Sequence, residues 1–162
     1  PAPAELGFLL ADLLLEGRQR LEASNGADDL VAFWRAFLGV PRPRGIERCL
    51  EVILDRMAVT SSAVFLRSTT VGLRLAAARP GEVSPALATI ARTAWGRQNG
   101  YMGHKEAKDG SEASTTAAVP VISVSRPLGI LAIERVGGRP LERADLALLA
   151  TLGERVAWAL GG

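Results

Sequence analysis

Two reactive side chains occur only once in this chain, those of His104 and Cys49. Nucleophilic catalysis needs a base that a carboxylate orients beside a serine or cysteine. His104 is the only candidate base, and Lys105 and Asp109 follow it in a polar run. The sequence has no nucleophile elbow, phosphate-binding loop or paired metal-ligand spacing. These residue types predict a protein that has no catalytic residues, holds no metal and is not an enzyme.

Both residues have a second interpretation. A single axial histidine on an apolar wall can hold a haem, so haem ligation by His104 stays open as an alternative. The run KEAKDG after His104 instead favours an exposed loop histidine. Cys49 lies one step from the apolar stripe of a predicted helix, which favours a small packing residue. A single cysteine excludes an internal disulfide, a cysteine-rich zinc site and a two-cysteine redox pair within the chain.

The charged residues do not indicate a nucleic-acid partner. Nineteen basic residues face 17 acidic ones, which leaves a formal net charge of +2. That excess is too small and too scattered for nucleic acid. Most of the basic residues are arginines, for which solvated surface positions are the simplest interpretation. Arg74 and Arg97 are nevertheless candidates for binding a phosphate or carboxylate, because guanidinium groups offer planar pairs of donors.

The chain also lacks an evident membrane segment. The apolar run over residues 8–15 is interrupted by Asp12 and is shorter than the roughly 20 residues that cross a bilayer. The opening PAPAEL has no charged leader of a signal peptide. We therefore expect a cytoplasmic protein with no membrane contact, and the absence of an initial Met suggests a fragment of a longer parent.

Hydrophobic periodicity predicts three helices before the first strand. Apolar residues repeat at threes and fours over 5–22, 30–38 and 46–57. The rigid PRPRG link precedes the third helix. We therefore predict an N-terminal helical extension over residues 1–43 and a domain over residues 44–162, which is long enough to bury its own core.

Strand patterns begin after the third helix. Residues 63–67 and 71–78 are separated by the polar STT and predict a hairpin. A helix follows over residues 85–95, with Ser84 as its cap and Pro85 in its first turn. Residues 96–115 are polar and glycine-rich, which predicts a mobile loop holding one short strand. Two strands that are apolar on both faces and a long amphipathic helix close the chain, which predicts an α+β fold.

The closing segment, TAAVPVISVSRPLGILAIERVGGRPLERADLALLATLGERVAWAL, resembles the GAF family of sensory domains. The hairpin motif matches at Val119, Pro120, Pro127, Leu128, Gly129 and Leu131. The helix motif matches at Leu141, Asp145, Leu148, Leu149, Val156, Ala157, Ala159 and Leu160. The resemblance covers about residues 44–160. It implies a GAF/PAS-like central antiparallel sheet, with the N-terminal, lead-in and C-terminal helices on one face and a short helix plus a lid loop on the other.

The resemblance also implies a ligand pocket beneath the lid formed by residues 96–115. The ligand-binding residues that we predict are Phe65, Leu73, Arg74, Trp95, Arg97, Tyr101, Met102, His104, Thr116, Val119, Val121 and Ser123. The alternative is that these side chains fill a core. A cyclic-nucleotide N-K…F…D-E signature and a bilin-attaching cysteine near the pocket are both missing from the sequence.

We therefore predict a non-catalytic sensory and dimerisation domain of a bacterial signal-transduction or transcription regulator. It would bind a small molecule and relay the signal through its terminal helices to an output domain. Leu149, Leu152, Val156 and Leu160 form an apolar stripe that predicts a homodimer seam. A ligand-free dimerisation module and a small enzyme of the methionine sulfoxide reductase type are the alternatives.

Overall fold

The computed structural model describes residues 4–23, 42–70, 72–124 and 126–161. A six-stranded sheet forms its centre, in the order β1-β4-β5-β6-β2-β3, and every neighbouring pair is antiparallel. The strands are β1 (Ala4–Phe8), β2 (Ser61–Ser68), β3 (Gly72–Arg79), β4 (Gly100–Lys105), β5 (Ser114–Ser123) and β6 (Arg126–Val136). The helices are α1 (Leu10–Ala23), α3 (Arg42–Met57), α4 (Pro85–Arg97) and α5 (Arg143–Gly161). The predicted α+β fold around an antiparallel sheet is confirmed.

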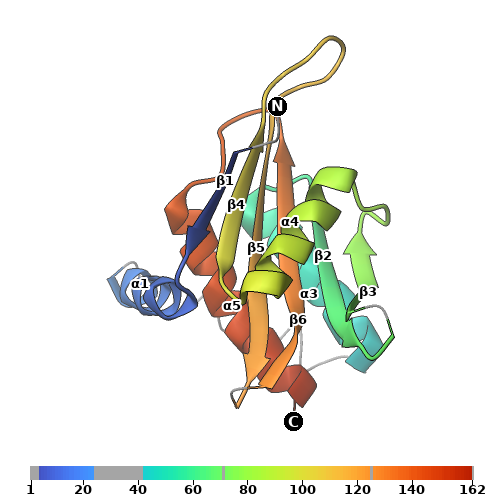
Figure 1. Ribbon diagram of the computed structural model, residues 1–162. Helices are drawn as coiled ribbons and strands as arrows, with labels where there is room; N and C mark the ends of the chain where they lie inside the picture. Colours follow the sequence, from blue (N-terminus) through green and yellow to red (C-terminus); the bar gives the residue numbers. More distant parts are fainter. Residues whose placement is uncertain (1–3, 24–41, 71, 125, 162) are drawn as a thin grey trace.

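The helices cover the two faces of the sheet unequally. Helix α4 lies alone across one face, whereas α3 and α5 cover the other, with α1 beside α5 (Figure 1). None of the helices in the described segments combines the length and hydropathy that crossing a bilayer requires.

The face under α3 and α5 carries the larger core. Because successive strand residues point to opposite faces, alternate positions of the central strands reach this layer. They are large and buried: Val64, Val119, Val121, Leu131 and Ile133. Helix α5 adds Leu146, Leu149, Leu152 and Val156 to the same cluster.

The face under α4 is built from smaller side chains. Strand residues Ala63, Ala118 and Ala132 meet Ala91 and Ala94 of the helix, together with a few larger residues. The small residues on both sides allow α4 to lie close to the sheet.

Helix α4 begins as the sequence predicts. The Ser84 hydroxyl accepts a hydrogen bond from the backbone N–H of Leu87 at 3.1 Å, and Pro85 occupies the first turn. The Ser84 O–H donates in turn to Glu134 Oε1 at 2.8 Å. The helix cap therefore also ties α4 to strand β6.

The N-terminal segment differs from the prediction. A strand replaces the first turns of the helix predicted over residues 5–22, and α1 begins at Leu10. Strand β1 pairs with the outer edge of β4, with Glu5 opposite Gly103 and Phe8 opposite Gly100. The open edge of β4 satisfies the backbone groups of β1, which outweighs the local helical pattern. The helix predicted over residues 30–38 lies outside the described residues, and the division at residue 43 stays a prediction.

The short strand predicted within residues 96–115 is confirmed. It is β4, and β5 already begins at Ser114. The connection between them extends beyond the end of the sheet and does not cover α4 (Figure 1). A ligand pocket beneath this segment stays a prediction.

Helices α1 and α5 pack in unusually close contact. A Cβ atom on Gly17 of α1 would lie 2.1 Å from Thr151 Oγ1 and 2.6 Å from the backbone oxygen of Ala147, both in α5. Any larger residue at position 17 would push the two helices apart.

Charged pairs flank this contact at both ends. Arg18 pairs with Glu154 at 2.7 Å, and Arg143 pairs with Glu16 at 3.0 Å. The Arg143 guanidinium also lies 5.2 Å from the centre of the Phe8 ring. These pairs are partly exposed, so each contributes little stability but helps to orient α1.

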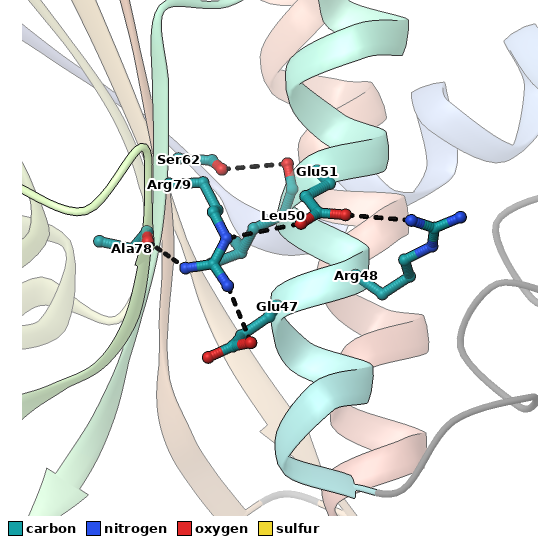
Figure 2. Close-up of polar contacts among 7 residues, drawn as sticks. All are labelled: Glu47, Arg48, Leu50, Glu51, Ser62, Ala78 and Arg79. Carbon is teal, nitrogen blue, oxygen red and sulfur yellow. Dashed lines mark hydrogen bonds and ion pairs between the residues drawn. The ribbon is translucent and has the colours of Figure 1, made fainter.

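Polar contacts join α3 to the edge strand β3 (Figure 2). Arg79 Nη2 lies 2.8 Å from Glu47 Oε2, and Arg79 Nε lies 3.6 Å from Glu51 Oε1. Nearby, the buried Ser62 hydroxyl donates to the backbone oxygen of Leu50 at 3.2 Å. These contacts hold the lead-in helix against the back of the sheet, as the resemblance implies.

Candidate functional site

Two hollows flank helix α4. The first, which we call the His104 hollow, has a volume of about 280 Å³ and lies between the start of α4 and strands β1, β4 and β5. Its lining is Glu5, Pro85, Ala86, Thr89, Ile90, Gly103, His104, Lys105, Ser114 and Thr116. The second, the Trp95 hollow, has a volume of about 300 Å³ and lies between α4 and the β2–β3 hairpin. Its lining is Phe65, Gly72, Leu73, Leu75, Ala88, Ala91, Arg92 and Trp95.

Two buried residues that carry hydroxyl groups line the His104 hollow. Ser114 and Thr116 are two residues apart on β5, so both side chains point to the same face. They are only 7% and 4% exposed. Neither hydroxyl makes a hydrogen bond to another described residue. Because neither hydroxyl has a partner among the described residues, both are available to bind the polar atoms of a ligand in the hollow.

The absence of a side chain at Gly103 leaves room for the Thr116 hydroxyl. A Cβ atom at position 103 would lie 2.7 Å from Thr116 Oγ1 and 3.5 Å from Ile90 Cδ1. Glycine therefore allows the Thr116 hydroxyl to lie over strand β4 at the hollow.

The hollow sits on a polar row that crosses the sheet. Glu5, Gly103, Thr116, Glu134 and Ser61 are successive partners in the registers of β1, β4, β5, β6 and β2. Directly opposed residues share a face, so this row lies on the α4 side. Glu134 is only 6% exposed. Its position beside the start of α4 suits a carboxylate, because a helix N-terminus carries partial positive charge.

Side chains of both charges line the hollow. Glu5 contributes a carboxylate, Lys105 an ammonium group and His104 an imidazole, and all three residues are exposed. The hollow therefore offers hydroxyls inside and charged groups on residues open to solvent. A small ligand with several polar atoms would fit this arrangement.

The Trp95 hollow has fewer polar side chains. Its lining includes Phe65, Leu73 and Trp95, and Arg92 is the charged residue among them. The surface of both hollows is mainly apolar.

The structure does not bring the predicted ligand-binding residues into one pocket. His104 and Thr116 meet in one hollow, and Phe65, Leu73 and Trp95 line the other. The remaining residues lie elsewhere. Tyr101 packs against the core on the α4 side. Met102, Val119 and Val121 pack in the core on the opposite face. Arg74 and Arg97 are exposed, and Ser123 is half-buried at the end of β5.

Strand parity explains the separation. Val119 and Val121 are an odd number of residues from Thr116, so they point to the α5 side of the sheet. Ser123 lies beyond the bulge at Val121 and Ile122, where the register shifts. A ligand-binding role for these residues stays a prediction.

The sequence interpretation missed several lining residues. Ser114 could have been found, because it shares the parity of Thr116. Gly103 and Glu5 gave no such signal, since they depend on the pairing of β1 with β4.

Cys49 lies on the other face of the sheet from both hollows. It is 1% exposed in the core beneath α3. Burial raises the pKa of its thiol from 9.0 to about 12. The thiol therefore stays protonated at neutral pH, which makes it a poor nucleophile and metal ligand.

The described residues also include no cluster of three or more His, Cys, Asp or Glu side chains that could hold a metal ion. A haem on His104 would need a deep apolar slot, whereas this histidine is exposed and the charged residues Glu5 and Lys105 also line its hollow.

Three of the four residues of the predicted dimer stripe are buried, and the side chain of Leu160 lies outside what the structure describes. Leu149, Leu152 and Val156 are 0%, 6% and 0% exposed and belong to the core beneath α5. Their own sheet covers them, so a homodimer would need other residues at its centre.

The comparisons with known proteins agree with this architecture. A family model described as GAF domain matches residues 46–161. The GAF domain of an Acinetobacter phosphoenolpyruvate-protein phosphotransferase has a TM-score of 0.62 at 13% identity, over 83% of this chain and 92% of that one. The GAF domain of the phosphoenolpyruvate-protein phosphotransferase from Coxiella burnetii has a TM-score of 0.57 at 12% identity, over 94% of this chain and 92% of that one. A far-red-absorbing protein with bound biliverdin has a TM-score of 0.58 at 10% identity, over 82% of this chain and 97% of that one. No curated protein matches the sequence. At these identities the likeness to solved structures concerns the fold alone.

Proposed function

Because the chain belongs to the GAF domain family, whose members are sensory regulatory modules, we propose that it is a non-catalytic sensory domain. It binds a small molecule in the His104 hollow. The pair Ser114 and Thr116 carries the proposal, since both residues are buried at the hollow and neither hydroxyl is hydrogen-bonded to a described residue.

Strand β5 offers a short route from this hollow to α5. Thr116 lines the hollow, while Ala117 and Val119 point to the opposite face. On that face, a Cβ atom on Gly153 of α5 would lie 3.4 Å from Val119 Cγ2. A ligand that moves β5 would therefore also move α5. The signal depends on a difference in ligand affinity between two positions of these elements.

The host would be a cytoplasmic bacterial signal-transduction or transcription regulator in which the terminal helices act on an output domain. Similar GAF domains occur in phosphoenolpyruvate-protein phosphotransferases, which supports a signalling context. Neither nucleic acid nor membrane would be a direct partner, given the small net charge.

The ligand site can be tested with two matched variants of α4. Ala86 and Ala88 are both half-buried, but Ala86 lines the His104 hollow and Ala88 lines the Trp95 hollow. Ala86→Phe should fill the first hollow and Ala88→Phe the second. Circular dichroism would establish that both variants fold.

The assay combines native mass spectrometry of the purified protein with thermal stability across nucleotides, amino acids, keto acids and haem. A ligand at a hundred times its dissociation constant should stabilise the wild type by about 2.7 kcal/mol. We expect the same gain in Ala88→Phe and none in Ala86→Phe. The opposite result would place the site in the Trp95 hollow and refute the proposal.

Dimerisation without a ligand is the second candidate function. Leu6, Leu9 and Leu15 are 63%, 62% and 56% exposed around α1, and exposed apolar side chains of this size favour association. Light scattering after gel filtration would test it. A dimer that Leu9→Lys and Leu15→Lys convert to a monomer, together with no ligand in the screen, would favour this function.

The sulfoxide reductase alternative is less compatible with the buried thiol. We expect no turnover of methionine sulfoxide in the presence of a dithiol reductant, because Cys49 stays protonated and inaccessible. Turnover that Cys49→Ala abolishes would refute a non-catalytic role.

A further inference from the structure

Strand β6 carries a buried cation that the sensory site does not use. Arg135 is 9% exposed. Its guanidinium donates to the backbone oxygens of Ala58 and Arg139, each at 3.1 Å, and to that of Met57. Met57 is the last residue of α3, so Arg135 joins the C-terminal end of this helix to the turn after β6. No carboxylate of the described residues forms an ion pair with Arg135.

A third hollow opens at this point, with a volume of about 400 Å³. It lies at the end of the sheet where β6 finishes and the turn toward α5 begins (Figure 1). Arg135, Arg139 and Thr60 line it, together with Gly137, Gly138 and small apolar residues. Two arginines therefore line one hollow, and its described lining residues include no carboxylate.

Donors remain available in this hollow. An arginine side chain has five N–H donors, and Arg135 uses three of them on the backbone oxygens. The Arg139 side chain makes no hydrogen bond or ion pair with a described residue. The Thr60 hydroxyl accepts from the Val136 N–H at 2.9 Å and keeps its own proton to donate.

Positive charge exceeds negative charge around this hollow. The C-terminal end of a helix carries about half a negative charge, so the end of α3 offsets only part of the charge on Arg135 and none of that on Arg139. The carboxylate of Glu112 near the same turn offsets a further part, and a bound anion would offset the remainder. The geometry points to an oxyanion site of the phosphate or phosphate-ester class, held between Arg135 and Arg139, because guanidinium groups bind such oxygens in pairs.

One acidic residue approaches the same turn. Glu112 Oε2 would lie 3.0 Å from a Cβ atom on Gly137. Its carboxylate repels an incoming anion or competes with it for the guanidinium groups. Removing this charge by Glu112→Gln should therefore strengthen phosphate binding, whereas removing a charge by Arg139→Gln should weaken it.

Titration with inorganic phosphate, followed by amide NMR spectra at constant ionic strength, would test the site. We expect saturable shifts at Thr60, Gly138 and Arg139, and none when chloride replaces phosphate. Arg139→Gln should raise the dissociation constant about tenfold, which corresponds to the loss of one charge-assisted contact. Glu112→Gln should lower it. Arg67→Gln, a matched change of an exposed arginine on β2, should leave it unchanged.

Acetate distinguishes a dianion site from a general carboxylate site. Binding of acetate as tight as that of phosphate would contradict the role of two guanidinium groups. Equal effects of Arg139→Gln and Arg67→Gln, or the absence of saturable shifts in the wild type, would overturn the proposal. These results do not depend on the His104 hollow, which lies against α4.

Discussion

The close packing of α1 on α5 makes a prediction that two alanine substitutions can test. Gly17 and Gly96 are both inside helices, α1 and α4 respectively. A Cβ atom at position 17 would lie 2.1 Å from Thr151 Oγ1 and 2.6 Å from the backbone oxygen of Ala147. A Cβ atom at position 96 would meet no heavy atom within 4 Å. The same chemical change therefore meets opposite surroundings.

The expected magnitudes follow from this difference. Replacing glycine by alanine within a helix stabilises it by about 1 kcal/mol, which should be the result for Gly96→Ala. At position 17 the same gain is opposed by overpacking, which costs about 1–3 kcal/mol in a close-packed site. The oxygen of Ala147 belongs to the backbone of α5, so it cannot move out of the way as a side chain can. We expect Gly17→Ala to be less stable than the wild type by up to about 2 kcal/mol, and less stable than Gly96→Ala by about 1–3 kcal/mol.

Urea denaturation followed by circular dichroism would measure both variants. Thr151→Ala combined with Gly17→Ala provides an internal control, since it removes the hydroxyl at 2.1 Å but leaves the contact with Ala147. The double variant should recover only part of the loss. If Gly17→Ala is as stable as Gly96→Ala, then α1 does not lie against α5 as described, and the reasoning is refuted.

Three further predictions concern single residues. Burial raises the pKa of the Cys49 thiol to about 12. Below about pH 9 the thiol is protonated in both the folded and the unfolded chain, so the free energy of unfolding does not change with pH through this group. Above about pH 9 the thiol ionises in the unfolded chain only, and the free energy of unfolding falls by about 1.4 kcal/mol per pH unit. Urea denaturation at about pH 8 and about pH 10 should show this drop in the wild type but not in Cys49→Ala. Ser84→Ala should cost about 1 kcal/mol in thermal or urea unfolding, because it removes the cap of α4 and the partner of Glu134; no loss would contradict the cap. Arg79→Met should cost less than about 1 kcal/mol, because its pair with Glu47 is half-exposed. A larger loss, or one that added salt leaves unchanged, would show that the pair acts by more than surface attraction.

Elements with short-range signals could be predicted from the sequence. The β5–β6 hairpin, the start of α4 at Ser84 and the closing helix all depend on residues near one another in the chain. The alternation of apolar residues and the cap were sufficient to locate them. Their positions in the structure agree with the predictions.

Elements at the β1 edge could not be predicted in the same way. Leu6, Leu9, Leu10 and Leu13 fit a helical repeat, which conceals the change from strand to helix at the start of the chain. Strand β1 exists because β4 offers an edge about a hundred residues later, with Glu5 opposite Gly103. Such pairing between distant segments leaves no local pattern in the sequence.

The candidate site shows the same division. His104 and Thr116 were predicted, and the parity of β5 would have added Ser114 while separating Val119. The shape of the hollow also depends on how closely α4 lies on the sheet and on the place of Glu5. Both are results of tertiary packing.

The unequal covering of the sheet has a consequence for its dynamics. Helix α4 buries only Leu87 and Ile90 as large side chains, the rest of its buried face being alanine, whereas α5 is held by several buried leucines. An element held by fewer apolar contacts detaches at a lower free energy. The backbone amides of α4 should therefore take up deuterium sooner than those of α5. A molecule bound beside Ala86 would slow that uptake. Deuterium labelling of this one helix would therefore report occupancy of the His104 hollow before the ligand is identified.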